Sequence, residues 1–295
     1  MPFLRERSGG WSAIKIVAFT GTVLPALWIA AQAVTGSLGA RPVTEAIHQC
    51  GDWALRLLFI TLAVTPAQRI LRYPRLIVCR RTLGVASAMY AVLHFSLYIL
   101  DQHFDFFKVA SEIVLRIYLT IGFLCLAGLS ALAVTSTDAM VRRLTAKRWH
   151  ALHRLVYVIA PLATAHFFMQ SKLDEYQPVL MAGFLVWLLG YRVLLKRTGE
   201  VGPLAVLLLG CVAAVNTALG EALFYLLTTG VDARLILLAH FASDMEIRPA
   251  WWVLAAGIVV AIAGAWRYRA PRQRERARRI TSAAFSEATQ VQSGS

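Results

Sequence analysis

The chain has 295 residues and a formal net charge of +14, yet only 16% of its residues are charged and 58% are hydrophobic. Soluble globular domains usually contain about 25% charged residues, so this composition excludes a soluble protein of ordinary type. The four cysteines lie far apart in the sequence and form no CxxC motif, which argues against a disulfide framework and against a zinc ribbon.

Eight segments are apolar enough to cross the hydrocarbon core as helices, for which about 18 residues suffice. They lie at roughly 12–35, 50–67, 83–100, 114–135, 151–169, 178–195, 203–228 and 250–266. The second contains two charges, Asp52 and Arg56, in its first turns. The first could be a signal peptide, but Pro25, Trp28 and the lack of an A-x-A site favour an uncleaved helix. We therefore predict an all-α integral membrane protein, a polytopic helical bundle of about eight spans.

Basic residues gather in alternate connections between these spans. One side of the membrane receives the arginines and lysines of 5–7, 69–81, 142–148, 192–197 and 267–279. The other side receives few cations together with Asp101, Asp105, Glu112, Asp174 and Glu175. The positive-inside rule makes the arginine-rich side cytoplasmic, so we expect a multi-pass protein of the bacterial inner membrane with both termini in the cytoplasm. The net charge reflects this topology and gives no evidence for nucleic-acid binding.

The spans divide the chain into four expected regions. These are a cytoplasmic N-terminus at 1–10, a six-span core at 11–197, a further two-span region of unknown role at 198–267, and a basic, disordered cytoplasmic tail at 268–295. The apolar stretch inside 231–245 is too short to span, and we expect an interfacial or re-entrant segment there.

Two histidines lie at matched depth inside predicted spans. His94 and His166 are both toward the non-cytoplasmic side, on the third and fifth spans, which run in the same direction. Ionisable residues at membrane depth are costly and mark functional sites by default. Neutral imidazole is a common metal ligand, and histidines on facing helices of a bundle can hold b-type haem. The alternative is that each histidine only forms hydrogen bonds across the bundle.

Four sequence segments, taken together and in order, resemble a known family. They are GDWALRLLFITLAVTP (51–66), RRTLGVASAMYAVLHFSLYILD (80–101), LAVTS (132–136) and RWHALHRLVYVIAPLATAHFF (148–168). They are similar to MsrQ (formerly YedZ), the haem-binding membrane subunit of the periplasmic protein-methionine-sulfoxide reductase system, in the ferric-reductase-like transmembrane group. The resemblance covers about 11–197. It implies a six-span ferric-reductase-like core that binds haem b through His94, His153 and His166, and that also binds FMN.

The resemblance also implies a function. A member of this family carries electrons from a cytoplasmic flavin reductase or the quinone pool to a periplasmic molybdopterin-containing methionine-sulfoxide reductase, and it has no catalytic residues of its own. Two other functions stay open. One is a self-contained ferric reductase or oxidase of the membrane cytochrome b type, against which the missing flavin and nicotinamide domain counts. The other is a non-redox transporter or structural subunit, in which the histidines are incidental.

His153 fits a simple haem site less well than the other two histidines. It lies thirteen residues before His166, which on an ideal helix is about 20 Å of rise and roughly 220° of rotation, so a kink at Pro161 would be needed to align them. The residue expected opposite His153 on the third span is Arg81, which cannot ligate iron and instead suits a flavin phosphate or a haem propionate. His153 therefore either ligates a second haem, with His150 as the first partner to examine, or lines a flavin, a quinone or a propionate.

The remaining histidines have ordinary explanations. His48 is expected to be interfacial, with a contact to the haem edge or to a partner protein as the alternative. His103 and His240 fall in loops, where solvation is the default.

Overall fold

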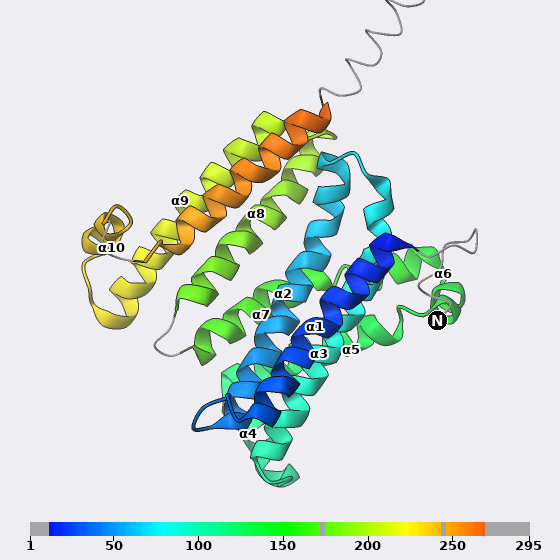
Figure 1. Ribbon diagram of the computed structural model, residues 1–295, viewed down its shortest axis with the longest axis vertical. Helices are drawn as coiled ribbons and strands as arrows, with labels where there is room; N and C mark the ends of the chain where they lie inside the picture. The colour runs from blue at the N-terminus through cyan, green and yellow to red at the C-terminus, as the bar shows by residue number, and fades with distance from the viewer. Residues whose placement is uncertain (1–11, 172–174, 243–245, 269–295) are drawn as a thin grey trace, which may run out of the picture.

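The computed structural model describes residues 12–171, 175–242 and 246–268, and their regular structure is entirely helical. The expected N-terminal region at 1–10 and all of the expected tail after Tyr268 lie outside the described residues. The elements (Figure 1) are α1 (Ala13–Thr35), α2 (Pro42–Ile70), the 3-10 helix η2 (Pro74–Val78), α3 (Cys79–Asp101), α4 (Phe106–Leu115), α5 (Ile117–Val134), α6 (Asp138–His153), α7 (Val156–Gln170), α8 (Tyr176–Thr198), α9 (Pro203–Thr229), α10 (Ala233–Ala239) and a last helix, Pro249–Tyr268.

Seven of the described helices are long and apolar enough to cross a membrane, and the bent pair α6–α7 can form an eighth crossing. This confirms the predicted polytopic bundle of about eight spans. The chain is a multi-pass membrane protein.

The second span is longer than predicted, because α2 begins at Pro42, and proline is favoured in the first turn of a helix. Its two charges lie one turn apart, with Arg56 Nη2 3.4 Å from Asp52 Oδ2 and the guanidinium over the ring of Trp53. Pairing one turn apart lowers the cost of carrying both charges on a spanning helix.

The fifth predicted span, 151–169, is not one continuous helix. The axes of α6 and α7 differ by 42°. At the junction the N–H groups of Arg154 and Leu155 bond to the carbonyls of Ala151 and Leu152, three residues back, which is the tight 3-10 pattern. The break lies more than a turn before Pro161, and α7 continues through Pro161. His153 and His166 consequently belong to different helices.

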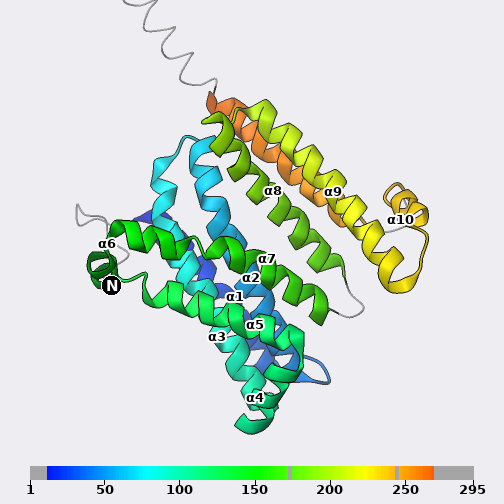
Figure 2. The ribbon, with the colours of Figure 1, turned by 180° about the vertical axis from the view of Figure 1, so that it is seen from behind.

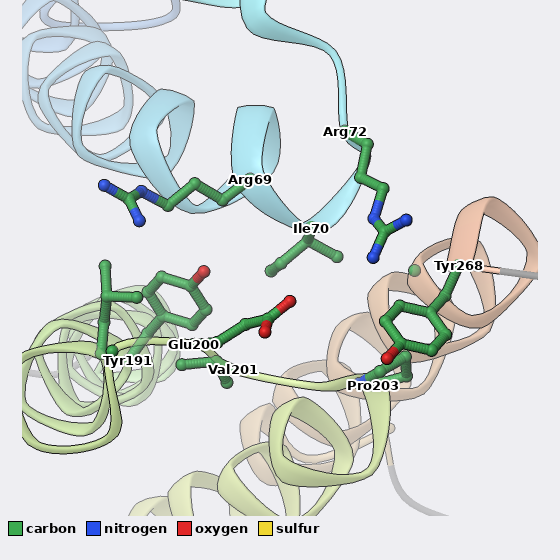
Figure 3. Close-up of a pocket in the computed structure, with 11 residues that line it drawn as sticks. Arg69, Ile70, Arg72, Tyr191, Glu200, Val201, Pro203 and Tyr268 are labelled. Atoms are coloured by element: carbon green, nitrogen blue, oxygen red, sulfur yellow. The ribbon is translucent and has the colours of Figure 1, made fainter. Parts of the chain in front are cut away.

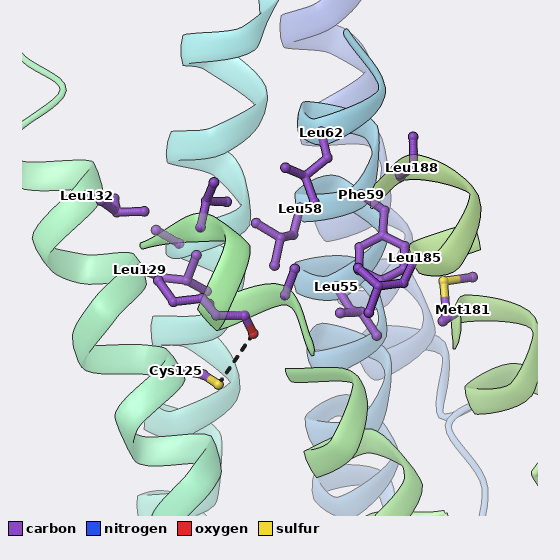
Figure 4. Packing of buried hydrophobic residues seen from close by; sticks show 14 residues of the cluster. Leu55, Leu58, Phe59, Leu62, Cys125, Leu129, Leu132, Met181, Leu185 and Leu188 are labelled. Atoms are coloured by element: carbon purple, nitrogen blue, oxygen red, sulfur yellow. Dashed lines mark hydrogen bonds between the residues drawn. The ribbon is translucent and has the colours of Figure 1, made fainter. Parts of the chain in front are cut away.

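The core is built where α2, α5, α7 and α8 meet (Figure 4). Leu58 and Leu62 of α2 are almost completely buried there. The thiol of Cys125 lies 3.8 Å from the carbonyl oxygen of Ile159, which brings α5 against α7. Burying apolar side chains from four helices in this way stabilises the bundle mainly through close packing, because lipid chains are as apolar as the side chains.

The C-terminal spans form a separate layer with α8. Figures 1 and 2 show α8, α9 and the last helix side by side along one flank of the molecule. α9 and the last helix approach closely where Gly210 faces Gly257, since a Cβ added to either would be 3.0 Å from the other's Cα. Small residues at such crossings are typical of membrane helices. α8 contacts α2 and α7 on one side and α9 on the other, so it joins the layer to the core.

Two connecting helices were not predicted in detail. α4 is a separate helix before the fourth span, capped by the carboxylate of Asp105, which accepts a hydrogen bond of 2.9 Å from the N–H of Lys108. α10 is a seven-residue helix inside 231–245, too short to span as expected, with Leu235 and Leu238 exposed. Residues 243–245 lie outside the described part of the chain.

Reporter fusions will test the orientation of this bundle. We expect a fluorescent protein fused after Ser295 to fluoresce and an alkaline phosphatase fused there to be inactive, because the arginine-rich connections hold that end in the cytoplasm. Phosphatase inserted in the 101–105 turn should be active. An active phosphatase at residue 295 would mean that the described helices cross the membrane an odd number of times after a cytoplasmic N-terminus.

Candidate functional site

A cavity of about 580 Å³ lies between α2, α3, α4, α5 and α7, on the side of the bundle away from the arginine-rich connections. His94 of α3 and His166 of α7 both line it. Their ring centroids are 6.4 Å apart and their ring planes are 87° apart. The structure thus brings together the two histidines that the sequence placed at matched depth.

Each of these imidazoles is fixed by a helix carbonyl. His94 Nδ1 lies 2.8 Å from the carbonyl oxygen of Ile47 on α2, and His166 Nδ1 lies 2.8 Å from that of Tyr118 on α5. A carbonyl oxygen only accepts, so each Nδ1 carries the proton and donates it. In a neutral ring the Nε2 atom is then left as a free lone-pair donor, which is the tautomer that metal-ligating histidines use.

A glycine faces each imidazole. A Cβ added to Gly51 would lie 3.0 Å from His94 Nδ1, and one added to Gly122 would lie 2.7 Å from His166 Cε1. Each glycine follows the accepting carbonyl by four residues on the same helix, Ile47 to Gly51 and Tyr118 to Gly122. The same arrangement therefore occurs twice. The carbonyl of one helix residue accepts the hydrogen bond, and the glycine one turn later leaves room for the imidazole ring.

The separation of the two rings suits one shared metal ion. A bond from a metal to an imidazole nitrogen is about 2.0–2.1 Å, so two imidazoles on opposite sides of one ion have ring centres about 6 Å apart. The observed 6.4 Å agrees with this value. Ring planes at right angles are compatible with it, because each plane only has to contain the line from its nitrogen to the metal. His94 and His166 could therefore be the two axial ligands of a haem.

The cavity is apolar at one end and polar at the other. Leu55, Leu58 and Leu129 line the end toward the arginine-rich side. The opposite end is lined by Glu45, His48, Tyr98, Gln102, Glu112, Arg116 and Tyr118. There Glu112 accepts from the Tyr98 hydroxyl at 2.6 Å and pairs with Arg116 at 3.2 Å. Such a gradient suits a planar group with an apolar body and a charged edge, as haem has.

The other predicted site residues lie elsewhere. His153 stacks on Trp149 with ring centroids 3.7 Å apart. Its Nδ1 is 3.0 Å from the Trp149 carbonyl oxygen and its Nε2 is 3.3 Å from the Ser136 hydroxyl, so both nitrogens have polar neighbours. Arg81, expected to face His153, instead forms a 2.6 Å ion pair with Asp138 at the surface.

Sequence reasoning missed a buried charge cluster in the C-terminal layer. Glu221 of α9 lies 3.0 Å from Arg248 and 3.4 Å from His240, and all three side chains are largely buried. The expectation that His240 is solvated is wrong, because the turn after α10 folds it back onto α9. A lone glutamate late in a long apolar span was the available signal, but its partners lie 19 and 27 residues further along the chain.

Comparisons with known proteins point to one family. Residues 50–164 match the family described as ferric reductase like transmembrane component. Over 170 residues, 57% of this chain and 81% of the relative, it is 41% identical to the protein-methionine-sulfoxide reductase heme-binding subunit MsrQ of Caulobacter vibrioides. The MsrQ subunit of Rhodospirillum rubrum is 41% identical over 190 residues, 64% of this chain and 89% of that protein. That of Xanthomonas campestris is 44% identical over 167 residues, 56% of this chain and 76% of the relative.

The chain belongs to the MsrQ family. No solved structure matches it. The match to the ferric-reductase-like component contains α3 with His94 and most of α7, and it ends two residues before His166. α8, α9 and the last helix lie beyond it.

Proposed function

We propose that the chain is a transmembrane electron-transfer subunit that holds one b-type haem between His94 and His166. The observation that carries this proposal is the pair of imidazoles 6.4 Å apart, each with its Nδ1 turned to a helix carbonyl and its Nε2 left to bind a metal. Membership of a family named for haem binding supports the same assignment.

The chain's own residues have distinct tasks in this proposal. His94 and His166 ligate, the carbonyls of Ile47 and Tyr118 hold their orientation, and the leucines of α2 and α5 exclude water from the apolar end. At the polar end Arg116 is the guanidinium that would meet a propionate, in competition with its present partner Glu112. Bound haem supplies a one-electron iron couple at this depth in the membrane.

We assign His153 to the entry side of the electron path and not to a second haem. Its Nδ1 also meets a carbonyl oxygen, that of Trp149, but its Nε2, the nitrogen that would bind iron, lies 3.3 Å from the Ser136 hydroxyl, and Trp149 stacks on its ring. The axes of α6 and α7 diverge, so His153 does not share a helix face with His166. A flavin such as FMN, or a quinone, in contact with this region would deliver electrons near His153. Arg81 is a weaker anion contact than the sequence indicated, because Asp138 neutralises it.

The partners follow from the family. The names of the relatives place them in a protein-methionine-sulfoxide reductase system as its haem-binding subunit. We propose that this chain passes electrons to a periplasmic molybdopterin-containing methionine-sulfoxide reductase and receives them from a cytoplasmic flavin reductase or from quinol. The polar end of the cavity, close to the turn between α3 and α4, is the expected exit side.

Substituting the ligands tests the proposed function directly. We expect His94→Ala and His166→Ala each to abolish the low-spin bis-histidine absorption of the purified protein, because one axial bond is lost. His103→Ala, in an exposed turn, is the matched control and should keep the wild-type spectrum. Full haem content with an unchanged spectrum in either ligand variant would show that the substituted histidine is not an axial ligand. The absence of a Soret band from the purified wild-type protein would contradict the proposed haem binding.

Adding one methyl group to Gly122 tests the positioning device. In Gly122→Ala the new Cβ would lie 2.7 Å from His166 Cε1, so the ring must move off its hydrogen bond with Tyr118. We expect at least a tenfold faster loss of haem to an acceptor apoprotein and a changed low-spin electron paramagnetic resonance signal. Gly220→Ala is the matched control, since its added Cβ meets nothing within 4 Å. Equal spectra and loss rates for both variants would show that the glycine does not position His166.

The number of haems separates the two interpretations of His153. We expect pyridine-haemochrome analysis to give close to one haem per chain. His153→Ala should slow reduction by the cytoplasmic donor more than it weakens the bis-histidine signal. Two low-spin haems, one of them lost in His153→Ala, would contradict this assignment and would make His150 the next residue to test.

A further inference from the structure

A second cavity, of about 370 Å³ and drawn in Figure 3, is lined by the ends of α2 and α8 that lie away from the histidine pair. It is enclosed by the end of α2, the end of α8 with the 199–203 connection, and the end of the last helix. Its size is within the range of about 300–1,000 Å³ that small-molecule sites have. Because its lining comes from α2 on one side and from α8 and the last helix on the other, the cavity lies where the C-terminal layer meets the core.

Charged and hydroxyl groups surround this cavity. Arg69 and Arg72 line it from α2 and the turn after it, and Glu200 lines it from the connection between α8 and α9. None of these three forms an ion pair with another described residue. Tyr191 is only 4% exposed, and its hydroxyl faces the same space without a hydrogen-bond partner among the described residues. The hydroxyl of Tyr191 and the exposed charged groups of Arg69, Arg72 and Glu200 are therefore available to a ligand.

The backbone at Arg72 is unusual. Its φ is 49°, in the left-handed region, which glycine favours and other residues rarely adopt. The Tyr73 N–H bonds to the Gln68 carbonyl at 2.9 Å, the pattern of a helix end at which glycine is the common residue. The conformation directs the guanidinium over the ring of Tyr268, 4.5 Å from its centroid. Arg72 therefore occupies a strained backbone position with its guanidinium at the cavity.

The position of the cavity narrows the class of ligand. Four helix ends meet around it, those of α2, α8, α9 and the last helix, so it lies at the level of the lipid headgroups. Basic pockets between membrane helices commonly bind the headgroups of phospholipids. Two guanidiniums alone would suit any phosphate. The carboxylate of Glu200 beside them would repel a headgroup that is only anionic and would attract an ammonium group.

We propose that this cavity binds the phosphoethanolamine headgroup of a membrane phospholipid. Arg69 and Arg72 hold the phosphate, and Glu200 with the Tyr191 hydroxyl receives the ammonium group. One bound lipid would then join α2 of the core to the C-terminal layer, whose last helix already touches α2 through Gly264 and Ile70. The same chemistry occurs in soluble phosphoethanolamine, and a phosphate alone occurs in flavin mononucleotide, so the experiment has to separate these sources.

Native mass spectrometry of the full chain, released from nanodiscs of equal phosphatidylethanolamine and phosphatidylglycerol content, tests the proposal. We expect the wild type to retain one phosphatidylethanolamine, about tenfold in excess over phosphatidylglycerol. Arg72→Gly should lose this lipid while it folds at least as well, because glycine relieves the left-handed backbone. Glu200→Gln should retain lipid but lose the preference. Arg75→Gln, an exposed arginine on the neighbouring η2 that does not line the cavity, is the control and should behave as wild type.

Three outcomes would overturn the proposal. Equal retention of both lipids by wild type and Glu200→Gln would show that no ammonium group is recognised. Loss of lipid in Arg75→Gln as well as Arg72→Gly would reduce the effect to general surface charge. Binding of soluble phosphoethanolamine, inorganic phosphate or flavin mononucleotide with no retained lipid would assign the cavity to a soluble ligand. None of these outcomes depends on haem content, which is measured separately.

Discussion

The structure depends on two hydrogen bonds of 2.8 Å, from the imidazoles of His94 and His166 to the carbonyls of Ile47 and Tyr118. Each bond requires an unobstructed helix carbonyl, and a glycine four residues later provides the space. It also requires the accepting helix to lie directly beside the helix that carries the histidine. These requirements fix α2 against α3 and α5 against α7. The cavity lies between these two helix pairs, because Gly51 of α2 and Gly122 of α5 each face one of the imidazole rings.

Because of the break between α6 and α7, His153 and His166 lie on two differently directed helices instead of one straight helix. On an ideal helix His153 would be about 20 Å from His166 and on a different face. The 3-10 turn at Arg154 and Leu155 ends α6 instead, and α7 leaves at 42°. α7 can therefore pack Ile159 against Gly128 of α5 and present His166 to the cavity. α6 remains beside the end of α5, where the Trp149 indole donates to the Thr135 carbonyl at 2.9 Å. His153 and His166 are thus positioned by different helices.

Hydropathy and charge were enough to predict the spans and the depth of His94 and His166, because both depend on local composition and on the bilayer. The partners of these residues were not predictable in this way. The carbonyls of Ile47 and Tyr118 are backbone atoms with no residue signature, and they lie 47 and 48 positions from their histidines. Arg81 was placed opposite His153 by counting along ideal helices, whereas its ion pair with Asp138 depends on where α6 begins. Glu221, Arg248 and His240 meet only because α10 folds back, which no periodicity indicates.

α2 connects the two cavities. Near its first turns it carries Ile47 and Gly51 at the histidine site, and its last turn carries Arg69 and Ile70 at the basic cavity. α2 is continuous over its 29 residues between the two cavities and has Pro66 inside its last two turns. Gly264 of the last helix leaves so little room beside Ile70 that a Cβ there would approach it to 2.8 Å. The C-terminal layer therefore contacts the helix that orients His94. Through this contact the C-terminal layer packs against the same helix that carries Ile47 and Gly51 at the histidine site.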